Sequence, residues 1–333
     1  MRGMSRRHSL NDDPDICEHG NGPRGPQVDT TAPGPRGGRR AMIDRVTQGK
    51  FQAGRRRLAF LLAPLLAVLC AGCALTFVYR HADWLILRQL DRYFDLTADQ
   101  RRDLTVRLTP LLARHRHEAI PEYEAALLEL RQRLARGLAG GDIDWVYTTY
   151  DRLRADLFER IVADGGVFLA SVDQHQVQRL QQVLRKDSRK ARRLAEAPAT
   201  ARLDTRAKAT IDTLEDWLGS LSADQRVHIR TLSLALPDTQ PVWVAYQQQR
   251  QQELLALLRQ PRTPELVARE LRAMLVYQEH TAPPAYQETV HRMRAAVKEM
   301  VLDIDRHLTS DQRGHAIARL QRFIDQLHAL QAH

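Results

Sequence analysis

The chain has 333 residues, of which 43% are hydrophobic and 6% aromatic, so it is long enough for one large domain or two average ones. Its formal net charge of +10 is concentrated before Cys73, where 12 Lys/Arg stand against 6 Asp/Glu, while the rest of the chain holds 38 and 34. This near balance after Cys73 excludes the strongly basic body typical of a nucleic-acid-binding protein, and we expect no nucleic-acid partner.

The first 72 residues have the order of an extension followed by a secretory signal. Residues 1–41 are rich in Gly, Pro and Arg and have too little apolar surface for a core, so we expect an unstructured extension and a true translation start at Met42. Residues 42–72 then predict a signal peptide. Arginines at 55–57 precede an uncharged apolar run at 58–71, which partitions into the bilayer while the arginines stay in the cytoplasm.

The apolar run ends in Cys70, Ala71, Gly72 and Cys73, which resemble the lipobox of bacterial lipoproteins. The usual third position before the cysteine is Leu, and here it is Cys70. We predict cleavage before Cys73 and a diacylglycerol and an acyl chain on its thiol, with no other cofactor. The mature chain then has one cysteine, which is modified, and so no disulfide.

An uncleaved membrane anchor over residues 58–79 is the alternative, because these 22 residues are uncharged and long enough to span a bilayer. Both interpretations place the following residues in the cell envelope, beyond the inner membrane. Ala74 after the cysteine favours the outer membrane, facing the periplasm.

Beyond residue 80 the hydrophobic spacing is helical, and no stretch alternates as a strand would. The last stripe is formed by Ala316, Leu320, Phe323, Ile324, Leu327 and Leu330. Prolines at 110, 121 and 264 predict helix starts, and Gly pairs at 140–141 and 165–166 predict helix ends or turns. We predict an all-α fold over residues 73–333, an elongated bundle of about eight to ten helices. It is either one domain or two packed halves meeting near residues 197–205.

A short pattern, Leu-Thr/Ser-x-Asp-Gln-Arg, begins at residues 96, 221 and 308, and a weaker copy lies at 173–176. It has the form of a capping box, in which the hydroxyl accepts the N3 amide and the Gln reaches back to the cap. The preceding Leu is placed for a hydrophobic staple. The pattern predicts well-formed helix starts, and the alternative is a set of duplicated helical hairpins forming a concave binding surface. Periplasmic stress chaperones carry a similar motif.

Residues 81–258 carry a longer series of motifs. They are Ala-Asp-Trp-Leu at 82–85, Asp-Arg-Tyr-Phe-Asp-Leu-Thr at 91–97, His-Arg at 115–116, Pro-Glu-Tyr at 121–123, Trp-Leu-Gly at 217–219, Leu-Pro at 236–237 and Trp243. In order and spacing this is similar to the bacterial lipoproteins of the domain of unknown function 6279. The resemblance implies a helical, envelope-associated protein without an assigned activity. Arg114 and Ala119 stand where the family often has Trp and Glu.

His115, His117 and Glu118 are candidate metal ligands by residue type, but helical geometry turns His117 away from His115, and no zinc-type spacing occurs. We therefore expect no metal site. Motifs for a catalytic serine or a phosphate-binding loop are also missing, and no catalytic residue or small-molecule substrate is predicted.

Two surfaces are candidates for binding. The first is a basic segment with a single acid, Asp187, which is either a solvated helix face or a surface for anionic phospholipid or lipopolysaccharide. Its six cations are Arg185, Lys186, Arg189, Lys190, Arg192 and Arg193. The second is the aromatic cluster of Trp84, Tyr93 and Phe94, which is expected to pack the first helix onto the body or, alternatively, to dock an envelope protein.

The sequence thus predicts a lipid-anchored cell-envelope protein whose helical body is a non-enzymatic binding or scaffold module. The alternative is an envelope hydrolase with an unrecognised site.

Overall fold

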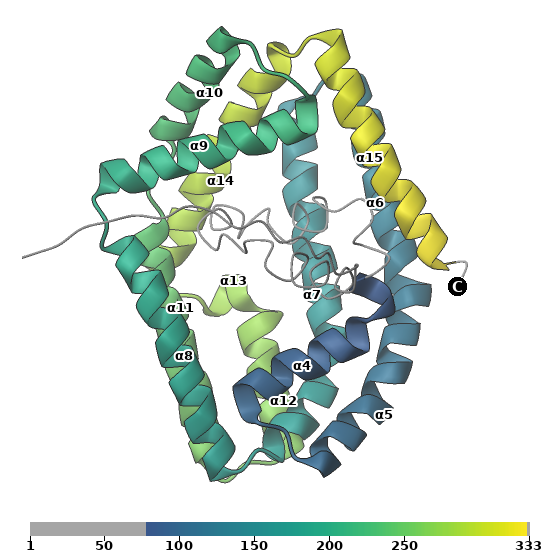
Figure 1. Ribbon diagram of the computed structural model, residues 1–333, viewed down its shortest axis with the longest axis vertical. Helices are drawn as coiled ribbons and strands as arrows, with labels where there is room; N and C mark the ends of the chain where they lie inside the picture. Colours follow the sequence, from purple (N-terminus) through teal and green to yellow (C-terminus); the bar gives the residue numbers. More distant parts are fainter. Residues whose placement is uncertain (1–77, 332–333) are drawn as a thin grey trace, which may run out of the picture. The chain divides into compact units, whose positions relative to one another are not determined.

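The computed structural model describes residues 78–331, and this part of the chain is folded into helices without a strand (Figure 1). The all-α prediction is confirmed, and the helices are slightly more numerous than expected. The helices are α4 (Ala82–Phe94), α5 (Ala98–Arg114), the π-helix η1 (His115–Ala119), α6 (Ile120–Ala135), α7 (Gly140–Ala170), α8 (Gln174–Ala195), α9 (Ala199–Leu218), α10 (Ala223–Ala235), α11 (Gln240–Arg259), α12 (Pro264–Leu275), α13 (Gln278–Thr281), α14 (Pro284–Arg306) and α15 (Ser310–Gln331).

The signal peptide and Cys73 lie outside the described residues. Among those that are described, no helix combines the length and the apolar character needed to cross a membrane. A short loop separates α8 from α9 at residues 196–198, and the rest of the segment 197–205 lies within α9.

All four predicted capping boxes form. At the start of α5, the Thr97 hydroxyl accepts the N–H of Gln100 at 3.2 Å, and the Gln100 side-chain oxygen accepts the N–H of Thr97 at 3.2 Å. The same reciprocal bonds begin α10, α15 and α8, at Ser222/Gln225, Thr309/Gln312 and Asp173/Gln176. The weaker copy at 173–176 is therefore a true member of the set, with a carboxylate in place of the hydroxyl.

The proline predictions hold only in part. Pro264 opens α12, with the Thr263 hydroxyl as its cap. Pro110, in contrast, lies inside α5, so the predicted helix start there is wrong. The Thr109 hydroxyl, one residue earlier, binds the carbonyl of Thr105 at 3.1 Å, and α5 continues into the π-helix without a break.

The glycine predictions are wrong at both pairs. Gly140 and Gly141 form the first turn of α7, and Gly165 and Gly166 lie within the same helix. The reason at Gly166 is packing, because a Cβ there would come within 2.6 Å of the Pro264 carbonyl oxygen on α12. The missing side chain lets α7 and α12 approach backbone to backbone.

The helices pack mainly in pairs, with α7 beside α12, α6 beside α15, α9 beside α10 and α8 beside α11 (Figure 1). The predicted C-terminal stripe is buried, and five of its members pack with Ile120 and Leu127 of α6 in one core cluster. A second cluster joins α4, α8, α11 and α12 around Leu258 and Val267, and a third joins α9, α10 and α15 around Leu221 and Ile229.

The capped loops meet two by two, which the sequence did not indicate. Gln100 and Gln176 exchange side-chain amide bonds of 3.0 and 2.7 Å. The remaining N–H of each amide binds a carbonyl in the partner's loop, from Gln100 to Ser171 at 3.4 Å and from Gln176 to Asp95 at 3.3 Å. Each amide thus has all of its donors and its oxygen engaged. We call this arrangement the first junction.

The second junction repeats the arrangement with Gln225 and Gln312. Their amides exchange two bonds of 2.9 Å each. The second N–H of Gln225 binds the His307 carbonyl at 3.2 Å, and that of Gln312 binds the Ser220 carbonyl at 3.0 Å. The apolar residues before the caps, Leu96, Val172 and Leu221, are buried beneath the loops. Four helical hairpins are therefore tied into two equivalent pairs.

Candidate functional site

The π-helix η1 interrupts the run from α5 to α6, and such turns often mark functional positions. Its wide turn is closed by the N–H of Ile120, which binds the His115 carbonyl five residues back. The next residue, Pro121, has no N–H to donate, so the regular helical bond pattern is already broken at this point. The extra residue in the turn directs His115 toward Tyr79 and Tyr123.

His115 is held between the two tyrosines. The Tyr79 hydroxyl donates its only hydrogen to the Leu112 carbonyl at 3.1 Å, so the 3.1 Å contact with His115 Nδ1 requires a hydrogen on Nδ1. His115 Nε2 then accepts from the Tyr123 hydroxyl at 3.3 Å. Burial, and secondly the charge of Arg160, lower the pKa of His115 below its ordinary value of 6.5. The imidazole is thus neutral, with both nitrogens engaged.

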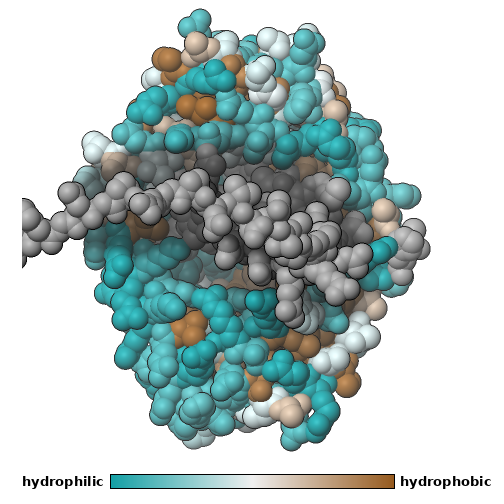
Figure 2. All heavy atoms as spheres, in the orientation of Figure 1, coloured by the Kyte–Doolittle hydropathy of each residue, from teal (hydrophilic) through white to brown (hydrophobic). Residues whose placement is uncertain are grey.

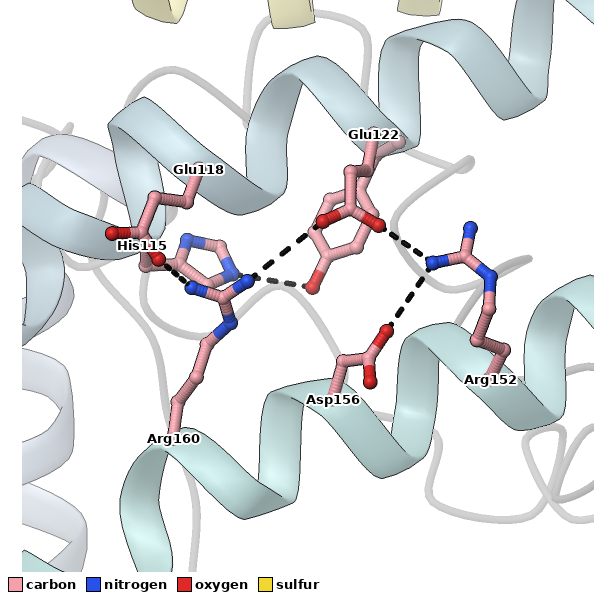
Figure 3. Close-up of polar contacts among 7 residues, drawn as sticks. His115, Glu118, Glu122, Arg152, Asp156 and Arg160 are labelled. Carbon is pink, nitrogen blue, oxygen red and sulfur yellow. Dashed lines mark hydrogen bonds and ion pairs between the residues drawn. The ribbon is translucent and has the colours of Figure 1, made fainter.

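A ladder of ion pairs runs beside His115 and connects η1 and α6 with α7 (Figure 3). Arg160 pairs with Glu118 and lies 3.8 Å from Glu122, and Arg152 binds Glu122 at 2.7 Å and Asp156 at 3.2 Å. Charges alternate along this ladder, so each carboxylate faces a guanidinium. The arrangement stabilises the contact between helices and leaves no carboxylate of the ladder directed at a substrate.

His115, His117 and Glu118 do not come together. His115 faces the tyrosines, Glu118 pairs with Arg160, and His117 is exposed on the π-turn. Within residues 78–331, a different group, His228, Asp303 and His307, brings three ligand-type side chains close together. Sequence reasoning missed it because His228 lies 75 residues before Asp303 and meets Asp303 and His307 only through the fold.

The basic segment lies on the second half of α8, and all six of its cations are exposed. The single acid, Asp187, is engaged elsewhere, since both its oxygens accept from Arg92 of α4 at 3.0 and 3.1 Å and one accepts from the Tyr93 hydroxyl at 3.2 Å. None of the six cations has an ion pair within the described part of the chain. Figure 2 shows a predominantly hydrophilic surface over α8.

The aromatic cluster is divided by the fold. Phe94 is buried and packs edge-on against Phe168 of α7 with ring centroids 5.1 Å apart, so it belongs to the core and offers nothing to a partner. Tyr93 is half-buried and connects α4 to Asp187. Trp84 remains 52% exposed, with the Arg88 guanidinium 5.1 Å from its ring centroid. Of the three, Trp84 alone retains the exposure that docking requires.

A shallow, open depression beside the first turns of α8 is lined by Asp95, His175, Gln178, Arg179 and Gln182. All five of these polar side chains are exposed, and at Asp95 the chain turns with a φ of 54°. Such a surface suits a polar contact better than the enclosure of a small molecule.

A further set of polar contacts supports the caps and was not predicted. The Arg that follows the capping Gln binds an acid on the preceding helix, in the pairs Arg101–Asp91, Arg226–Glu215 and Arg313–Asp305. An acid 8 to 11 residues before each Arg is the sequence signal for these pairs.

No curated protein and no solved structure matches the sequence. Residues 92–287 match the family described as "Family of unknown function (DUF6279)". The matched segment runs from the end of α4 into α14 and so includes the first junction, η1 and the basic segment. Because the match covers more than half of the sequence, the chain belongs to the DUF6279 family.

Proposed function

We propose that this protein is a lipid-anchored envelope protein, attached through Cys73, whose helical body binds without catalysing a reaction and rests its basic α8 face on an anionic membrane surface. The observation that carries the proposal is the set of exposed cations at residues 185–193, whose one neighbouring acid is occupied by Arg92 and Tyr93.

The charge of this face is larger than helix stability requires. Basic residues in a last turn favour the negative end of the helix dipole, which accounts for Arg192 and Arg193. Arg185, Lys186 and Arg189 lie one or more turns earlier, where the dipole effect has faded. Each cation near an anionic bilayer contributes about 1 kcal/mol, so the six together form a substantial second attachment.

A second attachment has a physical purpose beside a lipid anchor. An acyl anchor alone leaves the orientation of the body free, and lipid chains are commonly combined with a basic patch for stable binding. With Cys73 just before the described helices, the basic face would fix which side of the body meets the headgroups. In the envelope, the anionic groups are phospholipid headgroups or lipopolysaccharide phosphates. We propose that the basic face binds phospholipid headgroups.

The test uses the full lipidated chain in vesicles and measures how readily its own lysines are acetylated. Lys186 and Lys190 lie in the basic face, and Lys208 on α9 is an exposed control without an ion pair in the described residues. Vesicles of phosphatidylcholine with phosphatidylglycerol should protect Lys186 and Lys190 from amine acetylation severalfold relative to Lys208. Phosphatidylcholine alone should not, and added salt should remove the protection.

A charge-matched pair of variants separates this face from general attraction. Arg185→Gln, Arg189→Gln and Arg192→Gln should abolish the protection, whereas a control triple at exposed Arg114, Arg259 and Arg322 should keep it. Equal acetylation of Lys186 and Lys208 on both kinds of vesicle would show that α8 does not meet the membrane.

The anchor is tested separately. Cells grown with labelled palmitate should label the wild-type chain and leave Cys73→Ser unlabelled. Label retained by Cys73→Ser, or an unlabelled wild-type chain, would contradict the anchor. The acetylation test of the α8 face does not depend on this result.

A further inference from the structure

His228 of α10 and Asp303 and His307 at the end of α14 bring three metal-ligating side chains together, each with one ligand atom within 4.8 Å of the others. His228 Nε2 contacts Asp303 Oδ1. His307 Nδ1 donates to the Asp303 backbone carbonyl at 2.7 Å and lies 3.5 Å from the same Oδ1. The two imidazole rings are 5.1 Å apart, at an angle of 57°. All three side chains are partly exposed, between 26% and 59%, so an ion can enter from solvent.

The duplicated junctions show that the fold does not require this cluster. His228 stands three residues after Gln225, and His307 carries the carbonyl that Gln225 binds. In the first junction, the residue three after Gln100 is Asp103, which pairs with Arg107 at 2.8 Å, and the residue carrying the carbonyl is Ser171. Four residues before that carbonyl, the second junction has Asp303 and the first has Val167. The same backbone is therefore built once with the three ligand types and once without them.

We propose that His228, Asp303 and His307 form a binding site for a divalent transition-metal ion, with zinc as the reference ion. Two imidazole nitrogens and one carboxylate oxygen are the ligand types that Zn²⁺ prefers, at about 2.0–2.2 Å from the metal. Because His307 Nδ1 carries a hydrogen that it donates to the Asp303 carbonyl, Nε2 is the ring nitrogen left for the ion, and such a bond on the other nitrogen is usual for metal-binding histidines. Solvent completes the coordination.

The surroundings of Asp303 favour this use of its carboxylate. Arg306 donates to Oδ2 at 3.2 Å and leaves Oδ1, which faces both imidazoles, for the ion. Such a partner on the second oxygen fixes the orientation of a ligating carboxylate. Asp303 and His307 are one helical turn apart, while His228 comes from the neighbouring helix. A bound ion therefore joins α10 to α14 beside the second junction.

An ion pair between Asp303 and protonated histidines would use the same geometry without a metal, and metal binding itself distinguishes the two. Untagged, full-length protein is titrated with Zn²⁺ in competition with a chromogenic chelator, and Co²⁺ absorption reports the ligand set. The paired variants are His228→Ala/His307→Ala and, as a control, His117→Ala/His291→Ala, whose histidines are both exposed. Cysteines before residue 78 are common to all chains and cancel in the comparison.

The wild type and the control should bind one more Zn²⁺ per chain than the His228/His307 double variant. The rise in melting temperature that zinc causes in the wild type should be absent from the His228/His307 double variant. Asp303→Asn keeps the side-chain shape and should weaken zinc binding at this site at least about tenfold. Equal stoichiometry in the wild type and the His228/His307 variant, measured on chains with wild-type helical content, overturns the proposal. If that variant fails to fold, unchanged zinc affinity in Asp303→Asn overturns it.

Discussion

Replacing Gln176 with Met tests the paired-glutamine junction, because it keeps the length of the side chain and removes every hydrogen bond. Gln176 is only 2% exposed. Its amide donates to Asp95 and Gln100, at 3.3 and 2.7 Å, and its oxygen accepts from Asp173 and Gln100, at 3.1 and 3.0 Å. The substitution leaves the backbone groups of Asp95 and Asp173 without these partners.

The expected loss follows from these four bonds. A hydrogen bond contributes about 1 kcal/mol net, so the upper limit is roughly 4 kcal/mol, and it is reached only if no group regains a partner. Gln100 is half-exposed and regains water, which lowers the expected loss in the free energy of unfolding to about 3 kcal/mol. For a body of this size, that loss lowers the melting temperature by roughly 6–12 °C.

Urea and thermal unfolding followed by circular dichroism measure the effect. Gln178→Met is the control, because Gln178 is exposed on the same helix, and its free energy of unfolding should change by less than about 0.5 kcal/mol. A double-mutant cycle with Gln100→Met then isolates the pair. Since both single variants break the same two bonds, the double variant should lose about 1–2 kcal/mol less than the two single losses combined. Strictly additive losses would refute the reciprocal pair.

Three further predictions concern the packing and the π-helix. Gly166→Ala should lower the free energy of unfolding by about 1–3 kcal/mol, because its Cβ would overlap the backbone of α12; Gly141→Ala, with nothing within 4 Å, should not destabilise the fold. Arg206→Met should cost about 2–4 kcal/mol, since this buried side chain donates to the carbonyls of Ser233, Leu236 and Pro237 at 2.6–2.8 Å; exposed Lys208→Met is its control, and equal melting temperatures would contradict the capping role. The lowered pKa of His115 means that its neutral form stabilises the fold above the unfolded value of 6.5 and that this contribution is lost as pH falls through the folded pKa. His115→Asn should flatten the decline in melting temperature between about pH 7 and about pH 5, and a proton titration of the His115 ring at or above 6.5 would contradict the shift.

The helical class and the capped helix starts could be predicted because both depend on short-range spacing. Each cap is a bond between residues three apart, so it is visible in four letters of sequence. The pairing of Gln100 with Gln176, and not with Gln225, depends on which loops the tertiary fold brings together. Gln100, Gln225 and Gln312 share one local sequence pattern and Gln176 has a weaker copy of it, so the pattern does not indicate that Gln225 pairs with Gln312 and Gln100 with Gln176.

The errors at Pro110 and at the glycine pairs have a common physical origin. Local propensity treats Pro and Gly as breaks, but in this fold each of them lies inside a helix. At Gly166 the neighbouring helix requires the absence of a side chain. The π-turn at η1 was missed for a related reason, since its i to i+5 bond has no periodic signature, although Pro121 marks the place where the regular pattern ends.

The two junctions also provide an internal comparison that is useful without related sequences. Both keep the reciprocal amides, the loop carbonyl bonds and buried apolar residues before the caps, so these features belong to the architecture. Two of the differences fall on residues that the junction does not need. His228 and His307 replace Asp103 and Ser171, and the basic segment follows the first junction along α8 without a counterpart on α15. Because the fold tolerates either set, stability alone does not explain these choices, and they are the first positions at which binding should be measured.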